Sequence, residues 1–493
     1  MTNLSRSLIL GCSMLALAAC GPEEIASPGT GGNVIINNPA PTPTPAPTPA
    51  PTSSLVTPAA GCPTISATPG LTDEGTISGT TGEYRVCALP ARVNASSTLP
   101  YIKGVLYRLP GRVDVGTDQG AASTSTVVTL TIEPGVIVYA SGSAFLNVNR
   151  GNRINAVGSS TRPIVFTSRD NVLGINTANS SGQWGGVVLS GRAPVTDCLL
   201  PGAGNGTVDC ERQVEGAVDP ARYGGAQAAD NSGTMRFVQI RYSGFVLSGN
   251  AELQSLTTGG TGSATTLNNI QSVNSSDDGV EFFGGTTNIK NLIVAGAEDD
   301  GLDFDNGNKL NAQFVLIAQR PGVGDASMEV DTSNAGGNNT VPRTSGQLSN
   351  VTVIHRNTGD QVLRIRGGAD FNLVNSLVVD GSTGGIPCLR VDDAETIQAT
   401  GDDELGVPKF SSVAFQCATD TRAGSTGGAT APQAEAFLTG GAGNNINFTS
   451  TLTNGYLNGA SETGYTPIFN ATTLSLSRVK SPNVCERDCT TGW

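Results

Sequence analysis

The chain has 493 residues and a net charge of −13, with 41 acidic residues against 28 lysines and arginines and a single histidine. This balance argues against binding to nucleic acid or anionic lipid headgroups, and it leaves divalent cations and neutral or cationic molecules as ligand classes. With 64 glycines and only 14% charged residues, the composition favours short strands joined by tight turns. We expect one long domain, because a solenoid adds coils without adding domains.

The N-terminus carries a targeting segment. Arg6 precedes an apolar run that ends Leu17-Ala-Ala-Cys20-Gly21, and residues 1–19 resemble a bacterial lipoprotein signal peptide that is cleaved before a lipidated cysteine. The apolar run is too short to span a bilayer. We therefore expect Cys20 to carry fatty acyl chains such as palmitate. Gly21, in place of an aspartate, resembles lipoproteins sorted to the outer membrane, on either its periplasmic face or the cell surface.

Residues 20–61 have no hydrophobic periodicity and include a Pro/Thr-rich run over residues 38–52. Such a run favours polyproline II, and its 15 residues would span roughly 45 Å at about 3.1 Å per residue. We expect a tether that holds the folded part away from the membrane.

Eight cysteines remain after Cys12 leaves with the signal peptide and Cys20 takes the lipid. In an oxidising compartment they indicate disulfides, although eight cysteines allow 105 connectivities. A zinc site is disfavoured, because the chain has no Cys-x-x-Cys pair and one histidine, His355. Sequence proximity favours the pairs Cys62–Cys87, Cys198–Cys210, Cys388–Cys417 and Cys485–Cys489.

Short apolar strands separated by Gly, Asn, Asp and Ser fill the rest of the chain. The segments Leu130–Val138 and Arg153–Ser168 resemble the opening coils of bacterial right-handed parallel β-helix proteins, the pectin-lyase-like group, and the resemblance covers most of residues 100–480. Trp184–Pro194 and Gly233–Gly244 resemble an uncharacterised family of secreted or lipid-anchored bacterial β-helix proteins. The resemblance implies an all-β solenoid and no particular activity.

This fold divides the chain into five parts. After the leader and tether, residues 62–125 are expected to form an N-terminal cap with the first strands, because an uncapped solenoid exposes its core. Residues 126–480 are expected to form the parallel β-helix. Residues 481–493 are expected to form a disulfide-stapled tail.

An acidic segment is nearly repeated after 22 residues, from Ser276–Gly285 to Glu298–Gly307. That offset is about the length of one β-helix coil. Strand alternation then predicts that residues between the inward-facing ones form two outward columns across successive coils. One column contains Glu281, Asp303, Glu329, Arg364 and Arg390, and the other contains Phe283, Asp305, Asp331, Arg366 and Asp392.

Stacked carboxylates about 4.8 Å apart would repel each other by roughly 0.9 kcal/mol per pair in water. Three arrangements would relieve this repulsion: the acids bind a hard cation such as Ca²⁺, the arginines neutralise the nearest coil, or some acids cap backbone N–H groups. For Asp277, Asp278, Asp299 and Asp300 we expect turn formation. The predicted calcium ligands are Glu281, Asp303, Asp305, Glu329 and Asp331.

One functional hypothesis is a polysaccharide lyase or glycoside hydrolase. A lyase would use Ca²⁺ on the acidic column to hold a uronate, with Arg364 or Arg366 as proton acceptor. A hydrolase would use Asp303 and Glu329 as acid and base. The Gly-His-Gly segment of polygalacturonase-like enzymes is absent from the sequence, and His355 is expected to be structural. The aromatic residues expected to be exposed for sugar stacking are Phe283, Tyr242 and Trp184.

The alternative is a surface scaffold that binds a glycan, a neighbouring cell or an outer-membrane protein such as a transporter. The tether and a rigid stack of coils suit a protein that presents a surface. Because the catalytic signature is incomplete, we favour the scaffold, with Ca²⁺ as a stabilising ion.

Overall fold

The computed structural model describes residues 55–465, except for short gaps at 123–125, 215–219, 249–250, 334–338, 358, 360, 383–384, 399–404, 419–421 and 426. The predicted signal peptide, lipidated Cys20, most of the tether and the C-terminal pair Cys485 and Cys489 lie outside these residues. Among the described residues, no helix has the length and apolar character needed to cross a membrane.

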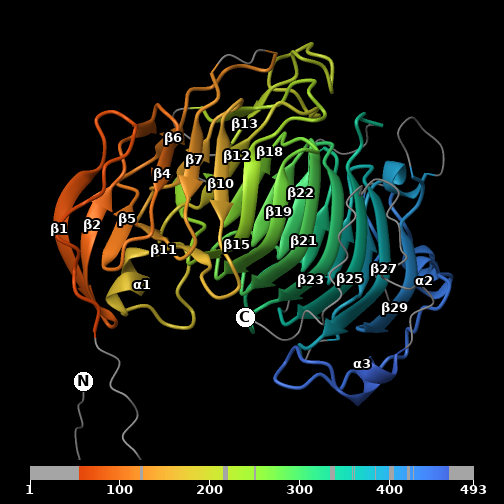
Figure 1. Cartoon of the computed structure of the whole chain (residues 1–493). Coiled ribbons are helices and arrows are strands. Elements are labelled where there is room, and N and C mark those ends of the chain that lie inside the picture. The colour runs from red at the N-terminus through yellow and green to blue at the C-terminus, as the bar shows by residue number, and fades with distance from the viewer. Residues whose placement is uncertain are drawn as a thin grey trace, which may run out of the picture. The chain divides into compact units, whose positions relative to one another are not determined.

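The described chain winds as a parallel β-helix (Figure 1). The smaller sheet, which we call sheet B, contains ten strands. In spatial order they are β28 (Leu389–Val391), β26 (Leu363–Ile365), β24 (Met328–Val330), β22 (Leu302–Asp305), β20 (Val280–Phe283), β18 (Leu256–Gly259), β12 (Val187–Ser190), β9 (Leu146–Val148), β6 (Val113–Val115) and β3 (Arg92–Val93).

The larger sheet, sheet A, contains 15 strands and runs alongside it. Its main path is β1 (Thr72–Gly79), β2 (Gly82–Ala88), β5 (Val105–Arg108), β8 (Ile137–Ala140), β11 (Ile164–Ser168), β15 (Gly233–Arg241), β19 (Thr266–Val273), β21 (Thr286–Ala295), β23 (Lys309–Ala318), β25 (Ser345–His355), β27 (Asp370–Asp380) and β29 (Lys409–Gln416). The strands β4 (Ser97–Leu99), β7 (Thr129–Ile132) and β10 (Arg153–Val157) lie off this path. All these strands pair in parallel except β1 with β2.

The long strands of sheet A bend at one left-handed residue per coil. These residues have φ angles between 49° and 60° and are passed over in the strand pairing. Asparagine tolerates this conformation better than most residues. The residues at the bend are Phe237, Asn269, Asn291, Phe314, Asn350, Asn375 and Ser412.

The core is built from alternate residues of each strand. Val280 and Phe282 of β20 and Leu302 and Phe304 of β22 are all fully buried, as the alternation predicts. Stacking the same positions on successive coils makes one continuous apolar core.

Both ends of the core are covered. At the N-terminal end β1 turns back antiparallel on β2, and the Cys62–Cys87 disulfide ties the preceding segment to the sheet. At the C-terminal end helix α2 (Ala431–Thr439) begins with a capping box at Thr430 and buries Ala434 and Leu438 against the last coil. The other helical segments are α1 (Arg169–Leu173), η1 (Ala394–Ile397) and α3 (Ala460–Gly464).

Three disulfides join Cys62 to Cys87, Cys198 to Cys210 and Cys388 to Cys417. They are three of the four pairs that sequence proximity favours. The fourth predicted pair lies beyond the described part of the chain.

A long excursion leaves the helix between β12 and β15. It comprises residues 191–214 and 220–232, and it contains the Cys198–Cys210 disulfide and a small hairpin of β13 (Arg212–Gln213) and β14 (Arg222–Tyr223). Its Tyr223 packs on Phe283 of sheet B with ring centroids 5.9 Å apart. Thr196 also donates a hydrogen bond of 3.1 Å to the carbonyl of Thr332. The excursion therefore covers part of the outer face of sheet B.

Two of the aromatic residues expected to be exposed are buried, so that prediction was wrong. Phe283 points outward from the core but is covered by Tyr223, which leaves it 4% exposed. Trp184 is 1% exposed and donates its indole N–H to the carbonyl of Arg241 at 2.8 Å. Tyr242 is partly buried.

Candidate functional site

The predicted outward column is present in sheet B. Glu281 pairs with Asp303, Asp303 with Glu329, Glu329 with Arg364 and Arg364 with Arg390. Phe283 pairs with Asp305, as expected for the neighbouring column. The strand register therefore places the acids on adjacent coils at strand spacing.

At the C-terminal end of the column the acids form ion pairs with arginines. Glu329 lies 3.1 Å from Arg364 and 2.8 Å from Arg366, and Arg366 also binds Asp331 at 2.8 Å. The side chains of Glu329 and Asp331 are only 9% and 5% exposed. Two of the predicted calcium ligands are thus already neutralised by guanidinium groups.

The next coil continues this network, because Asp392 binds Arg364 at 3.1 Å and Arg390 at 2.9 Å. Nearby carboxylates raise the pKa values of Arg364 and Arg366, although burial opposes the shift. An arginine held protonated by ion pairs cannot accept a proton. The geometry does not support the role of proton acceptor that the lyase hypothesis gives to Arg364 or Arg366.

Asp305, another predicted ligand, lies beneath the excursion and is 5% exposed. Its carboxylate accepts a hydrogen bond of 2.6 Å from the side chain of Asn306. It also lies close enough to Arg212 of the excursion to raise the pKa of that guanidinium group. Asp305 is therefore occupied by protein groups and is shielded from outside ligands.

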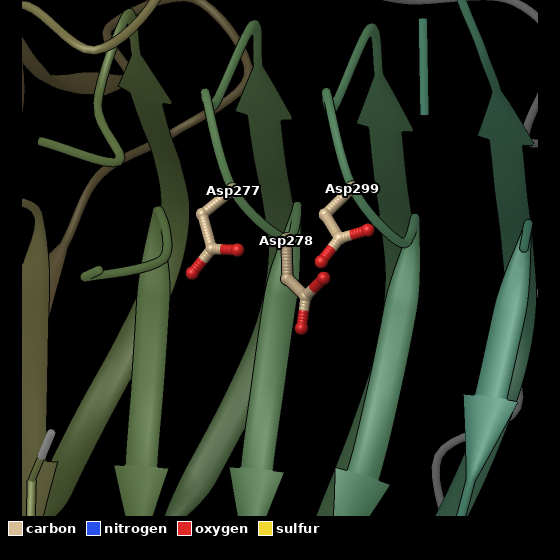
Figure 2. A group of neighbouring side chains, drawn as sticks. All are labelled: Asp277, Asp278 and Asp299. Carbon is tan, nitrogen blue, oxygen red and sulfur yellow. The ribbon is translucent and has the colours of Figure 1, made fainter. Parts of the chain in front are cut away.

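The acids at the other end of the column gather into one group. We call Asp277, Asp278, Glu281, Asp299, Asp300, Asp303 and Asp325 the acidic cluster. Three sets within it bring one carboxylate oxygen per residue to within 4.8 Å of the others: Asp277, Asp278 and Asp299; Asp278, Glu281 and Asp303; and Asp299, Asp300 and Asp325. Figure 2 shows the first set, with Asp277 and Asp299 on neighbouring coils and Asp278 between them.

The cluster is costly for the protein when every member is ionised. Burial, followed by repulsion from neighbouring acids, raises the pKa of Asp277 to about 7 and that of Asp299 to about 6. The same causes raise the pKa values of Asp278, Asp300 and Asp303 well above the ordinary range. Full ionisation of these carboxylates is therefore disfavoured, and either protons or a cation would relieve the repulsion.

Hydrogen bonds satisfy only part of the cluster. The backbone N–H of Asp300 donates to Asp278 Oδ1 at 2.8 Å, and Gln254 donates to Asp277 Oδ2 at 3.0 Å. The Oδ1 atoms of Asp300 and Asp303 are shielded from solvent and have no hydrogen-bond partner within the described residues. These oxygens remain open for a cation.

The sequence interpretation assigned Asp277, Asp278, Asp299 and Asp300 to turns. Asp278 does bind the backbone of the next turn, yet all four also belong to the acidic cluster. The sequence signal for the cluster was the Asp-Asp-Gly repeat together with Asp325, which occupies the equivalent position one coil later. Of the five predicted calcium ligands, Glu281 and Asp303 belong to the three sets of converging carboxylates described above. Asp305, Glu329 and Asp331 belong to none of these sets.

His355 is fully buried on β25, where its Nδ1 lies 3.1 Å from Ser327 Oγ. Burial lowers its pKa. The adjacent Asp380 uses both carboxylate oxygens to accept backbone N–H groups of Ser382 and Ile386. This arrangement gives His355 no access to an outside substrate.

A groove with a volume of about 250 Å³ lies on sheet A and is lined by residues outside the acidic cluster. The pairing places Asn288, Asn311 and Gln347 in register on three successive strands. Asn311 donates to Asn288 Oδ1 at 3.0 Å. The groove is lined by residues with amide and hydroxyl groups, by one lysine and by two apolar residues: Ser263, Thr286, Asn288, Asn311, Ser345, Gln347, Lys309, Ala228 and Leu310.

Comparison with known proteins identifies the fold family. A family described as "Pectate-lyase like beta helix domain" matches residues 114–456. None of the curated proteins matches the chain. A tailspike protein of the Acinetobacter baumannii phage AM24 is similar with 9% identity over 66% of this chain and 48% of its own, at a TM-score of 0.21. The chain spans about half of that tailspike, and we draw nothing from a likeness of this size. On the match over most of its length, the chain belongs to the family of pectate-lyase-like β-helix domains.

Proposed function

We propose that the protein is a calcium-binding β-helix scaffold, lipid-anchored in the outer membrane, that binds neutral carbohydrate without cleaving it. The observation that carries this proposal is the convergence of Asp278, Glu281 and Asp303, whose carboxylate oxygens lie within 4.8 Å of one another. Glu281 and Asp303 are paired in register across two strands, so rigid backbone positions both. Ca²⁺ takes six to eight oxygen ligands, and carboxylates are its usual protein ligands.

The charge of the cluster supports a divalent cation. Without one, the buried carboxylates repel each other, and their pKa values rise. A bound Ca²⁺ would replace protons as the neutralising charge and would link two coils that otherwise repel. Its main contribution would be to the stability of sheet B.

The same geometry supports binding over cleavage. The two arginines that a lyase would use as bases are held in ion pairs with Glu329, Asp331 and Asp392. The hydrolase pair is also unsuited to proton transfer, because the Glu329 side chain is only 9% exposed and is bound by two arginines. Neither Glu329 nor the arginines are available to move a proton on a substrate.

Charge and surface chemistry favour a neutral glycan over a uronate polymer. One Ca²⁺ carries less charge than the three carboxylates of its proposed site, so that site stays negative and repels polyanions. The groove on sheet A presents amides and hydroxyls suited to sugar hydroxyl groups. We take this groove as the carbohydrate site.

Calorimetric titration with Ca²⁺ tests the cation part of the proposal. The protein would be residues 21–493, which is the predicted mature polypeptide without its lipid. We expect saturable binding that weakens at least tenfold in Glu281→Gln and Asp303→Asn variants. A variant of the exposed Asp209, Asp209→Asn, serves as the control and should bind as the unmodified protein does. No binding, or equal binding in all four proteins, contradicts the cation site.

A glycan array tests the carbohydrate part. We expect retention of neutral glycans, loss of retention in a Gln347→Ala, Asn288→Ala variant, and no release of unsaturated uronates from pectin or alginate. Cleavage of a uronate polymer by the unmodified protein would replace the scaffold with the lyase hypothesis. Failure to retain any neutral glycan would contradict the groove as a carbohydrate site.

A further inference from the structure

The acidic cluster repeats over three successive coils. Asp277, Asp299 and Asp325 occupy one position of the turn that precedes each strand, and Glu281, Asp303 and Glu329 occupy one position within the strands. The pairing of Glu281 with Asp303, and of Asp303 with Glu329, fixes this equivalence. We call the space between two neighbouring acidic coils an interval, so three acidic coils have two intervals.

The first interval contains the calcium site of the proposed function, formed by Asp278, Glu281 and Asp303. The second interval contains Asp299, Asp300 and Asp325, whose carboxylate oxygens also lie within 4.8 Å of one another. These two sets share no residue. The second interval is thus a distinct place for a cation.

Asp300 supplies independent support for a ligand in the second interval. Its side chain is 5% exposed, and its Oδ1 has no hydrogen-bond partner among the described residues. A buried carboxylate oxygen without a partner is costly unless a ligand satisfies it.

The acidic coils are flanked by coils whose side chains differ from them in charge. On the preceding coil, Thr257 pairs with Glu281, and Gln254 donates a hydrogen bond to Asp277. On the following coil, Arg364 pairs with Glu329 and forms an ion pair with it. Among its described residues, the preceding coil therefore adds no cationic group, and the carboxylate of Glu252 nearby even raises the pKa values of Asp277 and Asp299. After the cluster, guanidinium groups take over the neutralising role.

We propose that a second divalent cation binds in the interval formed by Asp299, Asp300 and Asp325, one coil beyond the first. The inference rests on the proposed function, since both cations belong to the same acidic cluster. The second site is more accessible than the first, because Asp299 is exposed and Asp325 is partly exposed. We expect its affinity for Ca²⁺ to be weaker, at roughly the 10⁻⁴–10⁻³ M of extracellular modules.

Native mass spectrometry of residues 21–493 with Ca²⁺ added to saturation tests this proposal. We expect two bound cations in the unmodified protein and in Asp209→Asn, and one in Asp325→Asn. Glu281→Gln should also retain one, because it removes a ligand of the first site alone. Circular dichroism of each variant confirms that the β-helix is intact before cations are counted.

The outcomes separate the second site from the first. The second site is overturned if the unmodified protein binds one cation, Glu281→Gln binds none and Asp325→Asn still binds one. That result leaves the proposed function standing. Two cations in Asp325→Asn also overturn the second site. No cation in any of the proteins overturns both. If Asp325→Asn fails to fold, Asp325→Glu provides the second variant, since it keeps the charge and should keep two cations with the weaker site shifted in affinity.

Discussion

The backbone N–H of Asp300 donates a hydrogen bond of 2.8 Å to Asp278 Oδ1, across the interval between two neighbouring coils. One carboxylate thus holds the turn of the next coil and also faces the acidic cluster. Turn formation and cation binding are therefore compatible roles for the same residue. In this arrangement the spacing of the cluster is set by the same backbone contacts that stack the coils.

Replacing Arg364 by glutamine should lower the free energy of unfolding by about 1–3 kcal/mol, because Glu329 and Asp392 would each lose one of two arginine partners. Arg222→Gln is the control, since the Arg222 side chain is 45% exposed and its pair with Glu211 should contribute less than about 1 kcal/mol. Urea unfolding measures both. Equal losses in the two variants would contradict a stabilising role for the buried network.

In the presence of a chelator, stability should fall as the pH rises from about 4 to 7. The folded pKa of Asp277 is raised to about 7 and that of Asp299 to about 6, against an ordinary value of 3.8. In this window the folded chain holds more protons than the unfolded chain, so raising the pH favours unfolding. The contribution is fully present below pH 3.8 and is lost as the pH rises through the folded pKa values.

Thermal unfolding between pH 4 and 8, with and without Asp277→Asn, measures this contribution. The variant should show a shallower fall than the unmodified protein, because it removes one of the shifted groups. Identical pH profiles for the two proteins would show that Asp277 does not titrate in this range.

Tyr223 and Phe283 should be energetically coupled, since their rings pack 5.9 Å apart and fasten the excursion to sheet B. A double-mutant cycle of Tyr223→Ala and Phe283→Ala should give a coupling energy of about 0.5–1.5 kcal/mol. Tyr465→Ala paired with Phe283→Ala is the control, because Tyr465 packs on Phe448 instead. Additive effects in the first cycle would mean that the excursion is held by other contacts.

Replacing Cys20 by serine should release the protein from the membrane fraction, because the proposed acyl chains attach to this cysteine. Cys12→Ser should leave the membrane association unchanged, since that residue lies within the predicted leader. Fractionation of cells and labelling with radioactive palmitate provide the readouts. Membrane association that survives the Cys20 substitution would contradict the lipid anchor.

The sequence was sufficient to predict the β-helix and the register of its acidic column. The 22-residue offset between Asp277 and Asp299 fixes the coil length, and strand alternation places Glu281 over Asp303 as the pairing shows. These features recur on successive coils, so each coil supports the same prediction independently. Local sequence and global fold agree here, which is why the prediction succeeded.

Contacts made by the excursion were not predictable in the same way. Phe283 alternates outward on its strand, and only the return of Tyr223 over sheet B buries it. The sequence also did not show which acids are neutralised by arginines and which are left for a cation. Arg364 and Arg366 neutralise Glu329 and Asp331 because their long side chains reach back one coil, and the column alone does not show in which direction they reach.

Both proposed sites require cations to lie between the acidic coils. X-ray diffraction from crystals grown with Ca²⁺ and then soaked in a lanthanide would locate such ions by their anomalous scattering. We predict one peak coordinated by Asp278, Glu281 and Asp303, and a second by Asp299, Asp300 and Asp325. A map with no anomalous peak within the acidic cluster, in crystals that show lanthanide bound elsewhere, would contradict the account.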